Sequence, residues 1–186
     1  MRKMFVVLFS LLCVLVGGQT EIEYQNKILK KVLQKEGIID FSSIKELPVP
    51  GSAKKQHYVQ GKFFKINSDK SQYKYIYTGR VNSCRAGGCS ISVEQPMDAK
   101  SEYFDYFILF DSAKTVQLVK VYDYKATHGH EVTAKGWLKQ FISYDGSKSL
   151  KVDKNIDAIS GATISVYAIT FDIELKTQIL QGITTK

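Results

Sequence analysis

The 186-residue chain has few of the residues that build metal and thiol sites, with three cysteines and three histidines. Cys13 lies in an apolar run near the N-terminus, which leaves Cys84 and Cys89 for the rest of the chain. Two thiols without two further candidate ligands nearby argue against structural zinc. A c-type haem is excluded by pattern, because the spacing is not Cys-x-x-Cys and Ser90 follows the second cysteine.

Several signatures of common function classes are also missing from the sequence. No Gly-x-Gly-x-x-Gly follows a predicted strand, which argues against a nicotinamide site. No nucleophile, base and acid form a set that would favour hydrolysis. The lysines occur singly or in pairs, such as Lys30-Lys31 and Lys54-Lys55, without a nucleic-acid motif. We therefore predict no catalytic residue, no metal ligand and no nucleic-acid partner.

Residues 1–18 are predicted to be a signal peptide. Two basic residues precede a nearly unbroken apolar run from Phe5 to Val16, and small residues allow cleavage before Gln19. The run is too short to span a bilayer comfortably, and the leucine before Cys13 argues against a lipoprotein. Removing the two basic residues lowers the formal net charge from +8 to +6. We expect an exported protein, in the periplasm or at the outer face of the cytoplasmic membrane.

Residues 19–56 are expected to form an N-terminal helix and a connector that share one globular domain with residues 57–186. Thr20 begins a capping box, and the apolar helical stripe that follows stops at Gly37. Residues 38–56 contain two prolines and a glycine, which predicts a connector with little regular structure.

Aromatic and β-branched segments predict two β-hairpins. The first covers residues 57–66 and 73–81, and the second covers residues 103–111 and 115–124. Alternating tyrosines give the first hairpin an aromatic face, which either forms core or stacks on a planar ring, and core packing is the commoner case. A short helix is expected over residues 132–142. Strands grouped together with helices at the ends predict an α+β fold with an antiparallel sheet.

The strongest functional signal is the stretch Asp157-Ala-Ile-Ser160-Gly161-Ala162-Thr163-Ile-Ser165. Polar sequence precedes it, and a helical apolar stripe follows it. We expect Ser160 to be the N-cap, with Gly161, Ala162 and Thr163 in the first turn. The unpaired N–H groups of a first turn and the helix dipole favour a phosphate, and Thr163 adds a hydroxyl. The predicted stripe consists of Ile164, Tyr167, Ala168, Phe171, Leu175 and Ile179.

The string Asp-x-x-Ser-Gly-Ala-Thr resembles the flavinylation motif of FMN-binding domains, such as those of the C subunit of the sodium-pumping NADH:quinone reductase and the G subunit of the Rnf complex. The resemblance implies that Thr163 carries FMN through a phosphodiester bond and that residues 57–186 form the FMN-binding domain. It also implies that Asp157 is the aspartate needed by a separate flavin transferase, and that Ser160, Gly161 and Ala162 contact the cofactor. The alternative interpretation is a capped helix in which Ser-Gly-Ala-Thr only forms the turn at the helix start and binds no flavin.

A second segment, residues 125–141, is similar to a Lys-Glu-Thr-Pro-Gly-Leu-Gly segment of the same family that is followed by a helix with Trp and Phe. Thr127, Gly129 and Trp137 match it, and Glu131 echoes an acidic residue after the family's second glycine. The resemblance implies that Thr127, Gly129 and Glu131 belong to the FMN site.

This segment departs from the family pattern at two positions. Ala126 replaces the family's glutamate and His128 replaces its proline, so this side of the pocket need not be built alike. His128 and His130 would need a third ligand to hold a metal, and Glu131 would point the other way on a strand. We predict a flavin-pocket or proton-handling role for His128.

Cys84 and Cys89, with Gly87-Gly88 between them, are expected to form a disulfide in an exported chain. Because the ring is small, the entropic gain is about 2 kcal/mol. The alternatives are a redox pair that exchanges electrons with the flavin, or half of a metal site.

These observations predict an electron carrier rather than a stand-alone enzyme, with covalent FMN, passing electrons from a membrane reductase to an exported partner. Flavins transfer electrons singly or in pairs. Three alternatives stay open. They are a module of the same fold that never receives flavin, a thiol–disulfide protein using Cys84 and Cys89, and an enzyme whose flavin reduces a small acceptor directly.

Overall fold

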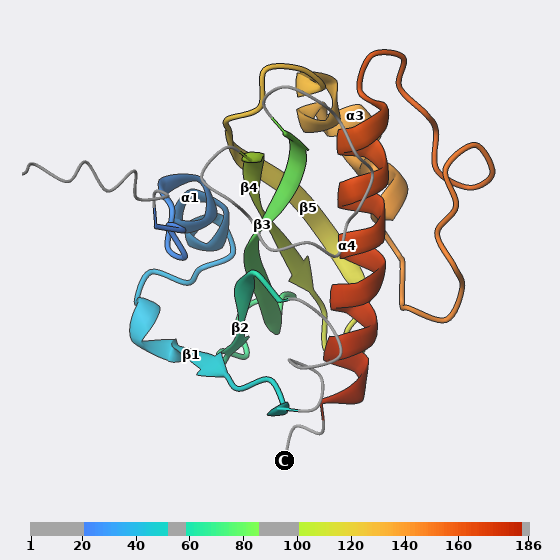
Figure 1. Ribbon diagram of the computed structural model, residues 1–186. Helices are drawn as coiled ribbons and strands as arrows, with labels where there is room; N and C mark the ends of the chain where they lie inside the picture. The colour runs from blue at the N-terminus through green and yellow to red at the C-terminus, as the bar shows by residue number, and fades with distance from the viewer. Residues whose placement is uncertain (1–20, 52–58, 86–100, 184–186) are drawn as a thin grey trace, which may run out of the picture.

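A computed structural model describes residues 21–51, 59–85 and 101–183 of the chain. Its centre is a five-stranded antiparallel sheet, in which each strand pairs with the next along the chain (Figure 1). The strands are β1 (Ile44–Leu47), β2 (Gly61–Ile66), β3 (Tyr75–Arg85), β4 (Ser101–Phe110) and β5 (Val116–Tyr124). The α-helices described are α1 (Lys27–Lys35), α3 (Lys135–Leu138) and α4 (Thr163–Gly182). The predicted α+β fold is confirmed.

Both predicted hairpins are present. β2 pairs with β3, and β4 pairs with β5, in each case antiparallel. The turn between β4 and β5 is held by the Asp111 side chain, whose Oδ1 accepts a hydrogen bond from the Thr115 N–H at 3.0 Å. Lys114 in this turn has a φ of 61°. The two hairpins form one continuous sheet because β3 also pairs with β4 along most of its length.

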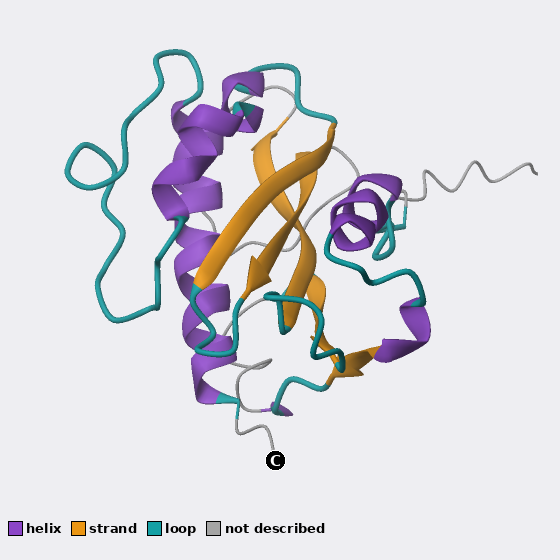
Figure 2. Ribbon diagram, turned by 180° about the vertical axis from the view of Figure 1, so that it is seen from behind, coloured by secondary structure: helices purple, strands orange, loops and turns teal. Residues whose placement is uncertain are grey.

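The two faces of the sheet bury separate clusters of side chains. α1 and α4 lie on opposite sides of the sheet (Figures 1 and 2). On the α4 side, Tyr77 packs in one cluster with Val166 and Ile169 of the helix. On the α1 side, Leu29 packs in a second cluster with Phe107. The aromatic face of the first hairpin therefore forms core, as the commoner case predicts.

α1 begins later than the sequence predicts. Its N-cap is Asn26, whose side-chain oxygen accepts a hydrogen bond from the Leu29 N–H at 2.8 Å. Thr20 lies outside the described residues, and residues 21–25 are not helical. The expected start was wrong because two residues that favour an N-cap precede the apolar stripe, and tertiary packing selects the second. The predicted stop is confirmed, since Gly37 follows the helix with a φ of 79°.

The connector after α1 contains regular structure that the sequence analysis missed. Residues 41–43 form a 3-10 turn, and β1 pairs with β2 so that Ile44 lies opposite Ile66. β1 is a four-residue strand at the sheet edge with two charged side chains, and such strands give little alternating signal. The expected domain boundary at residues 56 and 57 lies outside the described residues and stays a prediction.

The helix expected over residues 132–142 is instead broken into short pieces. A 3-10 turn (His130–Thr133) precedes α3, and a second 3-10 turn (Lys139–Phe141) follows it. Ala134 interrupts the run, because its backbone is extended, with a φ of −63° and a ψ of 123°. Buried Leu138 and Phe141 join the core on the α4 side of the sheet, so packing holds the segment in place without a long helix.

α4 buries a different stripe from the one predicted. Val166, Ile169 and Ile173 are fully buried, whereas Tyr167 and Phe171 are 42% and 43% exposed. The helix is apolar at so many positions that more than one stripe fits its period, and contact with the sheet decides between them. The predicted members Ala168, Leu175 and Ile179 are buried as expected.

Polar contacts fix α4 along its length. Near its middle, Asp172 accepts a hydrogen bond from the Tyr106 hydroxyl at 2.5 Å and pairs with buried Lys176 at 2.6 Å. At its end, Lys114 Nζ donates to the Ile183 carbonyl at 2.7 Å, and Gln181 Nε2 donates to the Asp145 carbonyl at 3.0 Å. The helix is therefore held against the sheet at its centre and at its C-terminus.

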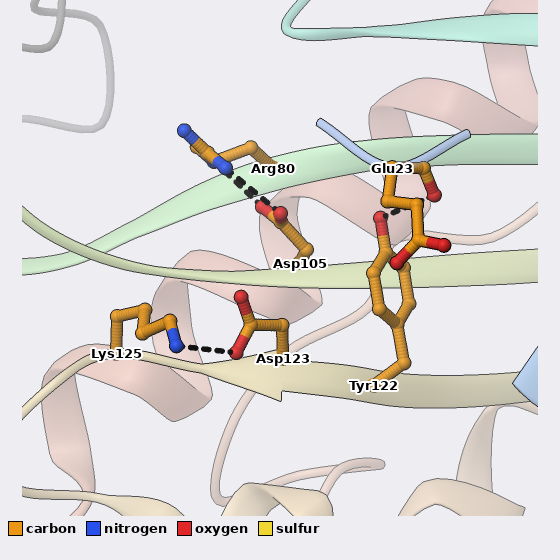
Figure 3. Close-up of polar contacts among 6 residues, drawn as sticks. All are labelled: Glu23, Arg80, Asp105, Tyr122, Asp123 and Lys125. Carbon is orange, nitrogen blue, oxygen red and sulfur yellow. Dashed lines mark hydrogen bonds and ion pairs between the residues drawn. The ribbon is translucent and has the colours of Figure 1, made fainter. Parts of the chain in front are cut away.

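A buried ion pair lies between β3 and β4 (Figure 3). Arg80 donates through Nε to Asp105 Oδ1 at 2.6 Å and through Nη2 to Oδ2 at 2.8 Å. Both side chains are almost fully buried. Burial raises the pKa of Asp105, and the Arg80 guanidinium opposes that rise. Asp123, opposite Asp105 on β5, makes an exposed pair with Lys125 instead.

In the part of the chain that the structure describes, no helix has the length and apolar character needed to cross a membrane. The predicted signal peptide lies outside the described residues, so it stays a prediction.

Candidate functional site

The two sequence motifs meet in one pocket of about 300 Å³ at the N-terminal end of α4. His128 and Gly129 come from the segment after β5, and Gly161, Ala162 and Thr163 come from the segment that leads into α4. Ser83, Ile164 and Ser165 complete the lining. The volume is at the lower end of the range for small-molecule sites. The fold thus joins segments that are about 30 residues apart in the sequence.

The start of α4 differs from the prediction. The N-cap is Ala162, and Thr163 is the first helical residue, so Ser160 does not cap the helix. A turn precedes the helix instead, in which Gly161 has a φ of 80° and the Ala162 N–H donates to the Ile159 carbonyl at 3.1 Å. The left-handed conformation of Gly161 separates Ser160 from the helix. Ser160 is exposed and does not line the pocket.

This late start leaves the first turn of α4 without a capping side chain. The N–H groups at the start of an α-helix have no intrahelical partner, and the helix dipole places partial positive charge there. Thr163, Ile164 and Ser165 belong to this turn and also line the pocket, and Thr163 is exposed. The pocket therefore offers what a phosphate needs, beside an accessible hydroxyl.

A chain of hydroxyl groups joins the two motifs. The Tyr124 hydroxyl donates to the His128 carbonyl at 2.5 Å, and it lies 3.0 Å from Ser165 Oγ. Ser165 Oγ in turn lies 2.7 Å from Ser83 Oγ. Because Tyr124 has one proton and gives it to His128, Ser165 must donate to Tyr124 and Ser83 must donate to Ser165. Ser83 therefore presents acceptor lone pairs at the pocket.

Tyr124 is well placed to stay a donor. Its ring stacks on Phe104 with centroids 5.3 Å apart, and the His130 ring meets it edge-on at 5.2 Å. Burial raises the pKa of Tyr124, and its hydrogen bonds with the serine hydroxyls lower it less than burial raises it. The phenol therefore keeps its proton and holds the His128 carbonyl against the start of α4.

Gly129 is required by this arrangement. Its φ is 88°, in the left-handed region, and a Cβ there would lie 2.5 Å from Ser165 Oγ and 3.0 Å from the Tyr124 hydroxyl. A side chain of any size would collide with the hydroxyl chain as well as strain the backbone. The predicted glycine thus allows the segment after β5 to approach the first turn of α4 closely.

Ser83 reaches the pocket because β3 is irregular near its end. The pairing of β3 with β4 shifts between Asn82 and Arg85, with one extra residue on β3. Such bulges re-aim side chains and occur beside functional sites. Ser83 and the role of Ser165 could not be predicted from the sequence, since a serine in a strand or in the first helical turn has no distinctive pattern.

Thr127 and Glu131 are near the pocket but do not line it. The Thr127 N–H donates to Glu102 at 3.1 Å, and its hydroxyl also donates to that carboxylate. The Thr127 hydroxyl therefore bonds to Glu102 of β4 and not to a group in the pocket. Glu131 is exposed at the start of the 3-10 turn.

Asp157 also lies outside the lining, in the exposed segment before the pocket. Its carbonyl accepts a hydrogen bond from Trp137 Nε1 at 2.8 Å, and its N–H donates to Gln140 Oε1 at 2.8 Å. Trp137 and Gln140, from the segment of residues 125–141, therefore hold the chain at Asp157, where the Asp157–Thr163 motif begins. These contacts leave the Asp157 side chain on the surface, where another protein can reach it.

The expected disulfide is not tested by the structure. Cys84 lies in β3, next to Ser83, and Cys89 lies outside the described residues. The pairing stays a prediction.

Comparison with protein families gives a match to the FMN-binding domain over residues 102–171. The match includes both motifs and most of the pocket lining, with Ser83 outside it. No curated protein matches the chain. The geometry at the start of α4 agrees with this match, which supports an FMN-binding domain over residues 102–171 of the chain.

Proposed function

We propose that this protein is an exported electron carrier whose FMN is bound through a phosphodiester to Thr163. The observation that carries the proposal is the position of Thr163, which is exposed at the first residue of α4 and lines the pocket with His128 and Gly129. The match to the FMN-binding domain over residues 102–171 supports a flavin-binding role in electron transfer. The covalent bond, export and partners are our proposal.

The residues present fit the phosphate end of FMN. The uncapped first turn of α4 supplies N–H donors and positive potential. Gly161 has open space where a Cβ would stand, so a phosphate ester can pass beside it. Thr163 Oγ1 would become the bridging oxygen, with overall loss of one water from the hydroxyl and the phosphate. Ser83 would accept a hydrogen bond from an N–H or O–H of the ligand.

When bound, FMN supplies transfer of one or two electrons. The chain's own residues hold the group and shape its surroundings. Tyr124 keeps the His128–Gly129 turn against α4 through its hydrogen bond to the His128 carbonyl. His128 is exposed and lines the pocket, which supports the flavin-pocket or proton-handling role that we predict from the sequence.

The proposed partners are a flavin transferase, a membrane reductase that supplies electrons and an exported acceptor. Exposed Asp157 is the residue we propose for transferase recognition, because it matches the aspartate of the family's motif. Export rests on the apolar run from Phe5 to Val16 and the polar sequence after Gln19. Covalent attachment would keep the cofactor from being lost outside the cytoplasm.

A thiol–disulfide function is the second candidate. The observation in its favour is that Cys84 follows Ser83, which lines the pocket. Titration of free thiols in the purified protein separates a stable disulfide from a reactive pair. If Cys84 and Cys89 stay paired under mild reduction, this candidate is dropped.

The test of the main proposal is the intact mass of the protein, with and without a co-expressed flavin transferase. Wild type should gain the mass of FMN less one water, and Thr163→Ala should gain nothing. Ser149→Ala is the matched control, since Ser149 is exposed but belongs neither to the Asp157–Thr163 motif nor to the pocket lining. It should be modified like wild type. An unmodified wild-type protein, in cells where a known acceptor domain is modified, refutes the carrier proposal.

A further inference from the structure

α1 concentrates positive charge that looked scattered in the sequence. Its nine residues, Lys-Ile-Leu-Lys-Lys-Val-Leu-Gln-Lys, include four lysines and no acidic residue. Its buried residues are Leu29 and Leu33, which pack on the sheet. The helix is therefore anchored by one narrow apolar side, and its other sides carry the charge.

Three of the lysines share the outward side of the helix. Lys27, Lys31 and Lys35 follow one another at four-residue spacing, so they form one row along the axis, about 12 Å long. All three are exposed, and the helical period places this row opposite Leu29 and Leu33. We call this row, together with exposed Ile28 and Ile39, the α1 face.

The charges on the α1 face are not neutralised by ion pairs within the described residues. Lys30 lies off the row and is over the Phe41 ring at 5.8 Å. The nearest acidic residues in sequence are Glu23 before the helix and Glu36 at its end. Glu36 accepts a hydrogen bond from Gln72 at 3.3 Å.

Two isoleucines give the α1 face an apolar component. Ile28 is 38% exposed within the helix, and Ile39 is 78% exposed just beyond its end. Gly37, with a φ of 79°, turns the chain between the helix and Ile39. Lysines combined with exposed aliphatic side chains are typical of helices that lie at a lipid headgroup layer.

We propose that the α1 face binds an anionic lipid surface. A row of lysines on one side of the helix matches the negative headgroups of a membrane. The two isoleucines can enter the headgroup layer, and this apolar contact favours a lipid surface over an acidic protein surface. Since α1 and α4 lie on opposite sides of the sheet (Figures 1 and 2), this contact keeps α4 on the side away from the lipid. Lipid binding by this face does not depend on flavin attachment.

The test is co-sedimentation of the purified protein with vesicles of phosphatidylcholine alone and with vesicles that contain phosphatidylglycerol. The variant is Lys27→Gln with Lys31→Gln and Lys35→Gln. The matched control is Lys148→Gln with Lys151→Gln and Lys154→Gln, three exposed lysines between β5 and α4. Far-UV circular dichroism and thermal unfolding show whether all variants fold.

Wild type should bind the anionic vesicles far better than the neutral ones, and added salt should weaken this binding. Neutralising the α1 lysines should lower the partition coefficient by about 100-fold, since each lysine near the surface contributes about fivefold. The control should change it much less. Any binding through the apolar run at residues 5–16 is common to all variants and to neutral vesicles.

Equal loss in the two triple variants would show a general charge effect and overturn the proposal. Equal binding of wild type to both kinds of vesicle would also overturn it, and would make an acidic protein the better occupant of the α1 face. Because unflavinylated protein serves in this assay, a failure here leaves the proposed role of Thr163 untouched.

Discussion

Replacing Gly129 with alanine tests whether the two motifs are held together as the structure shows. The new Cβ would stand 2.5 Å from Ser165 Oγ and 3.2 Å from Ser165 Cβ, with the backbone at a φ of 88°. The left-handed conformation costs an L-residue about 1–2 kcal/mol. Relief of the overlap by movement of packed atoms costs about 1–3 kcal/mol more. We expect Gly129→Ala to lower the free energy of unfolding by roughly 2–5 kcal/mol.

Gly161→Ala is the matched control, because it separates backbone strain from overlap. Gly161 has a φ of 80°, nearly that of Gly129, but no atom lies within 4 Å of the position that a Cβ would take there. Its substitution should therefore cost only the strain, about 1–2 kcal/mol. The difference between the two variants measures the close approach of the His128–Gly129 turn to α4.

The assay is urea unfolding monitored by circular dichroism. The dependence of the free energy of unfolding on urea concentration should be the same for each variant, so that the differences report stability alone. Ser165→Ala removes the nearest atom, so Gly129→Ala in that background should cost less than in wild type, by about 0.5–3 kcal/mol. If Gly129→Ala costs no more than Gly161→Ala, and Ser165→Ala gives no relief, the hydroxyl chain does not join the motifs and our account of the pocket is wrong.

Two further predictions concern the rest of the fold. Asp105→Asn leaves the Arg80 charge buried without its carboxylate and should lower the free energy of unfolding by about 3–5 kcal/mol in urea titrations. Asp123→Asn, in the exposed pair with Lys125, should lower it by less than about 1 kcal/mol. Similar costs for the two variants would contradict the buried pairing. Burial raises the pKa of Tyr144 from 10.0 to about 12, so the unfolded chain loses this proton first and the free energy of unfolding should fall as pH rises from about 10. Tyr144→Phe should make this fall shallower in denaturant titrations between pH 9 and pH 11, and an unchanged slope would refute the assignment.

The hairpins and the fold class could be predicted because they depend on local patterns. Alternating aromatic and β-branched residues mark β2 to β5, and the turn at Asp111 uses a side chain that favours turns. β1 could not be predicted in this way. Its four residues pair with β2 only because the chain after α1 returns along the sheet edge.

Helix starts were the weakest predictions, for a physical reason. Asn26 competes with Thr20 as a cap for α1, and a left-handed Gly161 displaces Ser160 from the start of α4. Local propensity permits each of these choices, and the tertiary fold selects one. Two exposed residues of α4, Tyr167 and Phe171, were wrongly included in the buried stripe, because Phe171 fits a helical stripe as well as Ile173 does.

The site itself was partly predictable. The motifs around Gly129 and Thr163 were found from sequence, and the fold brings both to one pocket. Ser83 and Tyr124 were not found, because their roles depend on a bulge in β3 and on a hydrogen bond to a backbone carbonyl. Contacts of this kind carry no residue pattern of their own.

The anchoring of α4 bears on how a carrier of this shape would deliver electrons. Asp172 fixes the centre of the helix and Lys114 fixes its end, so the helix that bears Thr163 is held on the sheet and is not a mobile arm. A flavin attached there, as proposed, would reach only as far as its own linkage to Thr163 allows. The gap that an electron must tunnel across is then set by the shape of the two docked surfaces. Substitutions on the partner's contact surface should therefore change the transfer rate more than lengthening any loop of this chain.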